Sequence, residues 1–340
     1  MVFTSVTAAL GLLAGLSAAL PRPLAPRQNS GEVVMYWGQN GGGTIENNDL
    51  STYCTEDAGV DIIVLAFLYQ FGNGNDIPSG TIGQSCFISN TGQGQNCEAL
   101  SKAITTCQGN GKKIILSIGG AVGSYSLQSE DEATRIGQYL WNAYGKGDGS
   151  TQRPLGDAVV DGFDFDLEAN RGNQYYAAMI AALRAGFATD PSRSYYITGA
   201  PQCPIPEPNM SVLIENARFD YLWPQFYNNN NYTVPCALPI NGNAPFNYDQ
   251  WVEYTAGTPS KDARLYVGVP AGPLGANGGP AGATYYATPE QLAEIVGEYK
   301  SHDRFSGIML WAAGFSDANT INGCTYAQQV KSILTKGSPC

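Results

Sequence analysis

The sequence predicts a (β/α)8 TIM barrel, an α/β fold, and three observations lead to that prediction. Eight apolar, β-branched or aromatic runs recur along the chain between turn signals, as expected of strands. Segments of helical character lie between them, and such alternation is typical of a parallel barrel. Once an apolar leader is set aside, about 310 residues remain, which suits one barrel. We therefore expect a single domain over residues 31–340.

The expected elements follow one another in chain order. We place the strands at residues 33–37, 62–67, 113–118, 162–166, 195–200, 221–226, 265–269 and 307–311. We place helices at residues 97–107, 130–144, 173–187, 289–299 and 325–334. The fourth of these helices has the clearest start, because Thr288 is an N-cap candidate and Pro289 suits the first helical position.

The leader indicates where the protein works. Residues 1–20 form an apolar segment that ends in small residues, which is typical of a secretory signal peptide and too short for a membrane span. Prolines at positions 21, 23 and 26 disfavour a helix or strand, so residues 21–30 form a candidate pro-segment or linker. We therefore predict a secreted, extracellular protein.

Composition excludes several classes of function. The net charge is −11 and no basic cluster is present, which argues against a nucleic-acid partner. The single histidine, His302, excludes a histidine-based triad and multi-histidine metal sites. The eight cysteines follow a leader and show no CxxC pair, so we expect disulfides rather than zinc. We predict no metal, no other cofactor and no membrane anchor.

Three acids at alternate positions of one predicted strand are the main functional signal. Asp164, Asp166 and Glu168 share one face of the strand, with about 6–7 Å between neighbouring backbone positions, and apolar residues occupy the other face. In a partly dry site these carboxylates cannot all ionise cheaply, so at least one pKa rises and a proton stays available near neutral pH. A general acid needs such a proton.

Two other interpretations fit the three acids taken alone. Acids at the rim of a sheet are often solvated or cap the following helix, and clustered oxygens can hold a hard cation. The residues at the ends of the other predicted strands favour catalysis. Polar and aromatic residues gather there, namely Tyr36, Trp37, Gln39, Gln225, Tyr227 and Trp311, while Gly119 and Gly120 end the third strand. Rings stack on the apolar faces of sugars while amides and acids bind hydroxyls, so we infer a polysaccharide substrate.

The run 161–168, Asp-Gly-Phe-Asp-Phe-Asp-Leu-Glu, resembles the DGxDxDxE signature of family 18 glycoside hydrolases, the chitinase family. Residues 117–120 are similar to that family's SxGG motif on the third strand. Residues 36–40 and 223–229 look like the plant-type, class III chitinases and their fungal relatives. The resemblance extends from about residue 31 to residue 311 or beyond and implies a barrel with catalytic acids at its mouth.

The resemblance implies a role for each acid, by a mechanism that the spacing of the acids does not itself reveal. Glu168 would protonate the glycosidic oxygen and later activate water. Asp166 would hold the substrate's N-acetyl group, whose carbonyl oxygen attacks the anomeric carbon, and Tyr227 would hydrogen-bond to that group. Asp164 would lie behind Asp166 and share a proton with it. Asp161 begins the strand at the other parity, so a structural role suits it better.

Further features are implied by the same resemblance. Gln225, Trp311 and Tyr36 would contact the sugar, and Gly119 and Gly120 would be structural. The expected disulfides are Cys54–Cys107, Cys86–Cys97 and Cys203–Cys236, and Cys324–Cys340 is the pair that remains. Cis peptide bonds are expected at Ala66–Phe67 and Trp311–Ala312.

We therefore expect a secreted, monomeric endochitinase that acts on chitin or chito-oligosaccharides with retention of configuration. Residues 269–307 leave no room for the α+β insertion that bacterial-type members carry between strands seven and eight, which favours an open cleft and internal cleavage. One alternative is an endo-β-N-acetylglucosaminidase that acts on N-glycans. The other is a non-catalytic chitin-binding lectin, storage protein or inhibitor on the same barrel, although such relatives usually lose the terminal glutamate or its partners.

Overall fold

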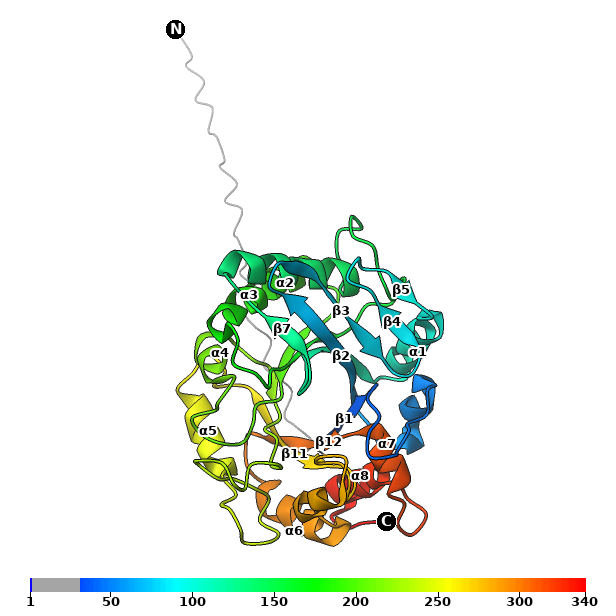
Figure 1. Cartoon of the computed structure of the whole chain (residues 1–340), viewed down its shortest axis with the longest axis vertical. Helices are drawn as coiled ribbons and strands as arrows, with labels where there is room; N and C mark the ends of the chain where they lie inside the picture. Colours follow the sequence, from blue (N-terminus) through cyan, green and yellow to red (C-terminus); the bar gives the residue numbers. More distant parts are fainter. Residues whose placement is uncertain (2–30) are drawn as a thin grey trace.

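Eight parallel strands close into a barrel in the structure, a computed structural model that describes residue 1 and residues 31–340 (Figure 1). Their order around the barrel is β1 (Glu32–Trp37), β2 (Ile62–Gly72), β6 (Lys113–Gly119), β8 (Gly162–Asp166), β9 (Tyr196–Gly199), β10 (Tyr221–Leu222), β11 (Arg264–Pro270) and β12 (Phe305–Trp311). Strand β1 pairs with both β2 and β12, which closes the ring. The predicted (β/α)8 TIM barrel is confirmed.

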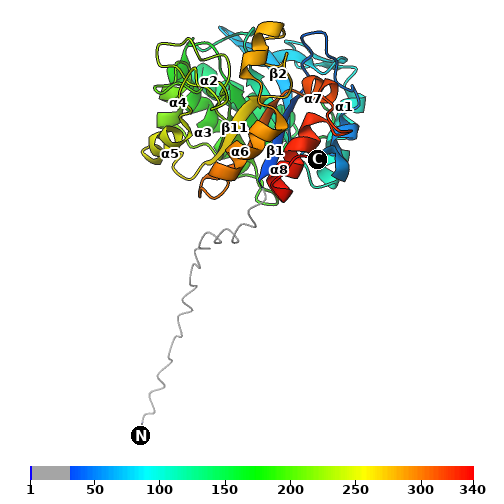
Figure 2. The ribbon, with the colours of Figure 1, turned by 90° about the horizontal axis from the view of Figure 1, so that it is seen from below.

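The helices surround the strands, as the side view in Figure 2 shows. Those that correspond to predicted helices are α1 (Glu98–Gly109), α2 (Glu130–Tyr144), α3 (Tyr176–Phe187), α6 (Pro289–Tyr299) and α8 (Tyr326–Lys336). Thr288 caps α6 through a capping box with Gln291, because its hydroxyl accepts the Gln291 N–H. The predicted helix at 173–187 begins too early, since the 3-10 turn η3 (Asn173–Tyr175) precedes α3.

The remaining elements were not predicted from the sequence. They include the short helices α4 (Ser211–Asn216), α5 (Tyr248–Ala256) and α7 (Ala313–Ala318), and the 3-10 turns η1 (Leu50–Cys54), η2 (Glu56–Ala58) and η4 (Pro280–Tyr285). Between β11 and β12 the structure holds η4 and α6, so the expected absence of an α+β insertion there is confirmed.

Strand β8 shows the two faces that its sequence predicts. Phe163 stacks on Phe187 of α3 with ring centroids 6.3 Å apart, and Phe165 meets Tyr176 of α3 edge-on at the same separation. These rings fill the layer between barrel and helices. The alternate residues Asp164 and Asp166 therefore point into the barrel, although both are buried.

Strand β2 is longer than predicted and carries a ribbon outside the barrel. Beyond residue 67 it pairs with β3 (Asn75–Ile82), which continues into β4 (Cys86–Ile88) and β5 (Gly94–Gln95). Asn73 and Gly74 at the tight turn both have positive φ, as a type I′ hairpin requires. The same strand pairs with the short strand β7 (Ser124–Ser126).

Strand β10 is shorter than the predicted strand at 221–226, and Pro224 explains the difference. Proline has no N–H to donate, so the ladder breaks at that residue. Pairing resumes one residue later, where the Gln225 N–H donates to the Pro201 carbonyl at 2.8 Å. Gln225 is thereby held at the mouth of the barrel without belonging to a regular strand.

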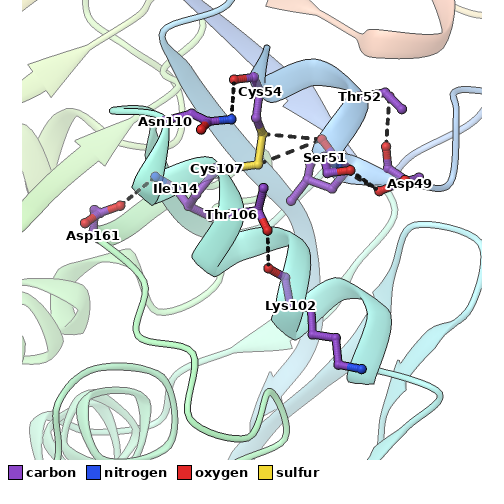
Figure 3. The surroundings of a disulfide bond; sticks show 11 residues. Asp49, Ser51, Thr52, Cys54, Lys102, Thr106, Cys107, Asn110, Ile114 and Asp161 are labelled. Atoms are coloured by element: carbon purple, nitrogen blue, oxygen red, sulfur yellow. Dashed lines mark hydrogen bonds between the residues drawn. A yellow bond between two sulfur atoms is a disulfide. The ribbon is translucent and has the colours of Figure 1, made fainter.

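All eight cysteines are paired, and the pairs are the four that the resemblance implied: Cys54–Cys107, Cys86–Cys97, Cys203–Cys236 and Cys324–Cys340. The first joins η1 to α1, where the Asn110 side chain also donates to the Cys54 carbonyl at 3.2 Å (Figure 3). A bridge over 53 residues stabilises the fold by roughly 4 kcal/mol in the chain-entropy model. The Ala66–Phe67 and Trp311–Ala312 bonds are cis, as expected.

The predicted signal peptide at 1–20 and the candidate pro-segment at 21–30 lie, apart from Met1, outside the described residues. Within the part of the chain that the structure describes, no helix is both long enough and apolar enough to cross a membrane.

Candidate active site

The acid row lies at the mouth of the barrel, at the end of β8. Asp166 and Glu168 line a cleft of about 680 Å³, and Asp164 lies one step deeper, fully buried. Glu168 is only half-buried, so it is the member of the row that is most open to a ligand. The structure therefore brings the three predicted acids together and orders them by depth.

Asp164 is held by three hydroxyl groups. Its Oδ2 accepts from the Tyr36 and Ser117 hydroxyls, and its Oδ1 accepts from the Thr198 hydroxyl, each at 2.7 Å. Burial raises the pKa of Asp164, while these hydrogen bonds stabilise its charged form and oppose the shift. The shared proton between Asp164 and Asp166 stays a prediction, because these bonds to Asp164 all come from hydroxyls.

Asp166 and Glu168 form a hydrogen-bonded carboxyl pair. Burial raises the pKa of both groups, and the charges of Glu168 and Asp164 raise that of Asp166 further. The Gln225 side chain donates to Asp166 Oδ1 at 3.1 Å and to the Ala200 carbonyl at 3.0 Å, which fixes one face of the pair. Two carboxyls in contact, one buried and one half-buried, cannot both ionise cheaply, so the pair holds a proton.

Tyr227 lies beside this pair in the same cleft and is buried. Burial, followed by the charges of Asp166 and Glu168, raises the pKa of its phenol well above the usual value. The phenol therefore stays protonated and can donate a hydrogen bond into the cleft. The hydrogen bond from Tyr227 to the substrate's N-acetyl group stays a prediction.

Aromatic rings form the floor of the cleft. Trp311 is half-buried at the end of β12 and stacks on Phe67, with centroids 6.0 Å apart and planes 20° apart. The Tyr36 ring lies 5.5 Å from the Trp311 ring, and its hydroxyl accepts the Trp223 indole N–H at 2.9 Å. The exposed part of Trp311 offers a flat apolar surface to a sugar ring.

Gly119 and Gly120 let β6 approach β8 closely. Both have positive φ, and a Cβ on Gly119 would lie 2.1 Å from the Asp166 carbonyl oxygen. The Gly120 N–H donates to that same carbonyl at 2.7 Å. These contacts support the structural role that the resemblance implied for the two glycines.

Asp161 lies at the opposite end of β8, away from the cleft. It accepts the Ile114 N–H and the Gln108 amide, each at 2.8 Å, and pairs with Arg193 (Figure 3 shows the Ile114 bond). These contacts tie the start of β8 to its neighbours. They support a structural role, as its position in the strand suggested.

Sequence reasoning assigned no role to several residues that hold the site in place: Ser117, Thr198, Trp223 and Tyr125. Ser117 lies within the SxGG motif, and only the register between β6 and β8, which sets Ser117 opposite Asp164, reveals its contact. Thr198 is likewise set opposite Asp164 by the β8–β9 register. No sequence signal pointed to Tyr125, because β7 was not predicted.

The described residues contain no cluster of three or more side chains suited to a metal ion. Within them, the residues that line the cleft also include no lysine, arginine or histidine. The chemistry of the site is thus that of carboxyls, a phenol, an amide and rings. A carboxyl pair that holds a proton can protonate a leaving oxygen, and the aromatic floor beside it suits the apolar face of a sugar. A barrel with a protonated carboxyl pair and an aromatic floor in its cleft belongs to the glycoside hydrolase class.

Comparison with known proteins gives the family. The profile described as glycosyl hydrolases family 18 matches residues 32–284. The chain is 64% identical over 335 residues to Endochitinase 2 of Metarhizium robertsii, covering 96% of this chain and 80% of that protein. The chain therefore belongs to glycosyl hydrolase family 18.

Solved structures agree with this assignment. The chain is similar to the ICChI chitinase of Ipomoea carnea, with a TM-score of 0.71 and 31% identity over 88% of this chain and 99% of that one. It is also similar to the xylanase and alpha-amylase inhibitor protein XAIP-II of Scadoxus multiflorus, with a TM-score of 0.69 and 26% identity over 92% and 100%. Enzymes and an inhibitor thus share this barrel, so function must be argued from the site.

Proposed function

We propose that the protein is an endochitinase, which hydrolyses β-1,4 bonds between N-acetylglucosamine units of chitin with retention of configuration. The observation that carries the proposal is the Asp166–Glu168 carboxyl pair in the cleft, held by Gln225 and flanked by Tyr227. The similarity to a fungal endochitinase at 64% identity supports the choice of substrate.

Glu168 is the proposed general acid. Its carboxyl is the most open of the row, and burial raises its pKa, so it carries a proton at a higher pH than an exposed glutamate does. It gives this proton to the glycosidic oxygen as the bond to the anomeric carbon breaks. The resulting carboxylate then takes a proton from the water that attacks the intermediate, which restores the acid.

The substrate's own acetamide is the proposed nucleophile, as family membership implies. Its carbonyl oxygen bonds to the anomeric carbon as the leaving oxygen departs, and the cyclic oxazolinium that forms is positively charged. Asp166 lies beside Glu168. When Glu168 carries the proton of the pair, Asp166 is a carboxylate that can accept the acetamide N–H, and its negative charge stabilises the positive charge that develops on the oxazolinium. Tyr227 donates to the acetamide oxygen and orients it.

Trp311 is the proposed floor for the sugar whose bond is cleaved. Its stack on Phe67 fixes the plane of the ring, and Tyr36 closes the wall beside it. Between β11 and β12, the loop at residues 275–278 lines the cleft, whereas η4 and α6 do not. A short Gly-rich loop in place of an inserted domain supports a cleft that accepts a chain extending both ways, and hence internal cleavage.

Secretion belongs to the same proposal. Four disulfides within the described residues persist only where the surroundings are oxidising, and they support an extracellular enzyme. We propose that it acts there as a monomer. Size-exclusion chromatography with light scattering on the secreted protein tests the oligomeric state.

A substrate comparison tests the proposal. The enzyme should release short oligomers from chitin hexamer and leave a high-mannose glycoprotein intact at equal protein concentration. Release of the N-glycan with no cleavage of the hexamer would assign an endo-β-N-acetylglucosaminidase instead. Binding of the hexamer without turnover would assign a lectin or inhibitor, and the presence of both Asp166 and Glu168 argues against that result.

A further inference from the structure

Glu168 lies beyond the last regular pair of the ladder between β6 and β8. The register of these strands ends at Gly119 opposite Asp166, so the Glu168 N–H has no ladder carbonyl of its own. An unpaired backbone N–H at a buried site costs free energy and leaves the peptide free to move. The proposed general acid thus lies two residues past the last ladder pair of β8, where no regular sheet hydrogen bond fixes its backbone.

A side-chain hydroxyl replaces the missing ladder bond. The Tyr125 hydroxyl accepts the Glu168 N–H at 2.9 Å and donates to the Gly120 carbonyl at 3.0 Å. Gly120 in turn donates its own N–H to the Asp166 carbonyl at 2.7 Å. The peptides from Asp166 to Glu168 are therefore connected to the end of β6 at two points, one direct and one through Tyr125.

Tyr125 is held rigidly enough for this task. It lies in β7, which pairs with β2 and sets Tyr125 opposite Phe71. The two rings stack with centroids 5.4 Å and planes 12° apart, and the Phe71 ring packs edge-on against Tyr176 of α3. Burial, more than the nearby charge of Asp166, raises the pKa of Tyr125, so its hydroxyl keeps the proton that it donates to Gly120.

We propose that Tyr125 is a positioning residue for Glu168. Its hydroxyl bridges the Glu168 N–H and the Gly120 carbonyl, and so holds the Glu168 backbone in the position from which the side chain reaches the cleft. The inference rests on the proposed function of Glu168. Without the hydroxyl, the Glu168 peptide relaxes and its carboxyl moves toward solvent. Proton transfer then slows, while the residues that bind the rest of the substrate stay in place.

The test compares Tyr125→Phe with a matched control, Tyr176→Phe, in the same group of packed rings formed by Phe71, Tyr125 and Tyr176. Tyr176→Phe removes a hydroxyl that is buried and has no hydrogen-bond partner in the described part of the chain. On chitin hexamer we expect Tyr125→Phe to lower kcat about tenfold with KM within twofold, since small misplacements of reacting groups have effects of this order or larger. The upper limb of its pH profile should shift to lower pH, because a more solvated Glu168 has a pKa nearer the ordinary value. Tyr176→Phe should match the wild type in kcat and in pH profile.

A second measurement tests the inference independently of any change in rate. Hydrogen exchange of the Glu168 amide, followed by mass spectrometry of a peptide that spans it, should be faster in Tyr125→Phe and unchanged in Tyr176→Phe. Unchanged exchange together with an unchanged pH profile in Tyr125→Phe would overturn the inference. Equal losses of kcat in the two variants, in parallel with a lower Tm, would also overturn it.

The design separates this inference from the proposed function. If Glu168→Gln loses turnover and Tyr125→Phe keeps the full rate and profile, only the positioning role of Tyr125 fails. If Glu168→Gln keeps full activity, the proposed function fails and the inference fails with it.

Discussion

The two ends of the barrel hold their acids in opposite ways. Where strands begin, acids pair with cations, as in Glu32 with Lys113 and Arg264, Asp61 with Lys331, Asp161 with Arg193, and Asp220 with Arg184. The three aspartates also accept the N–H of a residue on a neighbouring strand, Val33, Ile114 and Ile197 respectively, each at 2.8 Å. Where strands end, Asp164, Asp166 and Glu168 contact hydroxyls, an amide and one another.

Strand β8 carries both arrangements, with Asp161 at its start and Glu168 just past its end. A cation beside an acid stabilises the charged form and ties strands together, whereas acids gathered without a cation must keep a proton. The same residue type thus stabilises the fold at one end and can supply acid chemistry at the other. Substitutions at the two ends should therefore separate stability from activity.

Glu168→Gln should give the largest effect on activity. The amide has the shape of the acid but cannot give a proton to the leaving oxygen, so we expect kcat to fall by about 10³-fold. Binding of chitin hexamer, measured by calorimetry, should survive, and a thermal melt should show an unchanged Tm. Turnover near the wild-type rate would contradict the role of the acid row.

Asp166→Asn should have the next largest effect. The amide cannot stabilise the positive oxazolinium as a carboxylate does, and we expect kcat on chitin hexamer to fall by about 10²-fold. The fold should be preserved, because Asp166 forms no ion pair among residues 31–340 that the substitution could break. A large drop in Tm would show instead that this end of the barrel, like the other, uses its acids for stability.

Asp161→Asn should act on stability alone. It breaks the pairing with Arg193 and weakens the bonds from Ile114 and Gln108, so we expect the free energy of unfolding to fall by about 2–3 kcal/mol. Urea denaturation measures this loss, and kcat on chitin hexamer at 25 °C should stay within twofold of wild type. A tenfold loss of kcat in folded protein would contradict the assignment of stability to one end of the barrel and of catalysis to the other.

Glu46 allows a finer test, because it is a buried acid near the cleft wall with no cation partner described. Its pKa is raised to about 7, chiefly by burial and in small part by the charge of Asp317, although hydrogen bonds from the Gly38 backbone and Asn40 oppose the shift. The Tyr53 hydroxyl faces Asp317 in the same cluster. The folded state therefore binds this proton more tightly than the unfolded state does, and its contribution to stability is lost as pH rises from about 4.5 to about 7.

Glu46→Gln should remove that pH dependence. The difference in free energy of unfolding, variant minus wild type, should increase by about 2 kcal/mol when the pH is raised from 5 to 8. Urea denaturation of both proteins at each pH measures it. Glu207 contributes a similar dependence of its own, since burial also raises its pKa to about 7 although backbone N–H groups that bind its carboxyl oppose the shift, so Glu46→Gln removes only the share of Glu46. A wild-type difference that Glu46→Gln leaves unchanged would mean that other acids carry it.

The sequence predicted the barrel and the acid row because both depend on local patterns. Alternation within residues 162–168 places the acids on one face, and eight apolar runs indicate eight strands. The lengthened β2 and its hairpin were missed although Asn73–Gly74 is a recognisable type I′ turn signal. The predicted strand at 221–226 is longer than β10 because Pro224 has no N–H to donate to the ladder.

The supports of the site could not be predicted from the sequence for a different reason. Ser117 and Thr198 meet Asp164 only because neighbouring strands adopt one register, and Tyr125 reaches Glu168 only because β7 docks on β2. Such contacts join residues that are distant in the chain. Alternation within a single strand shows which face a side chain takes, but it does not show which residue of another strand it will meet.

The most direct test of the proposed chemistry is the configuration of the first product. Proton NMR of chitin hexamer during the first minutes of hydrolysis reports the anomer at each new reducing end. Attack by the acetamide and then by water inverts the anomeric carbon twice. We therefore expect each cleaved internal bond to give the β anomer first, which mutarotates afterwards. Initial release of the α anomer would mean that water attacks directly, and it would contradict the roles given to Asp166 and Glu168.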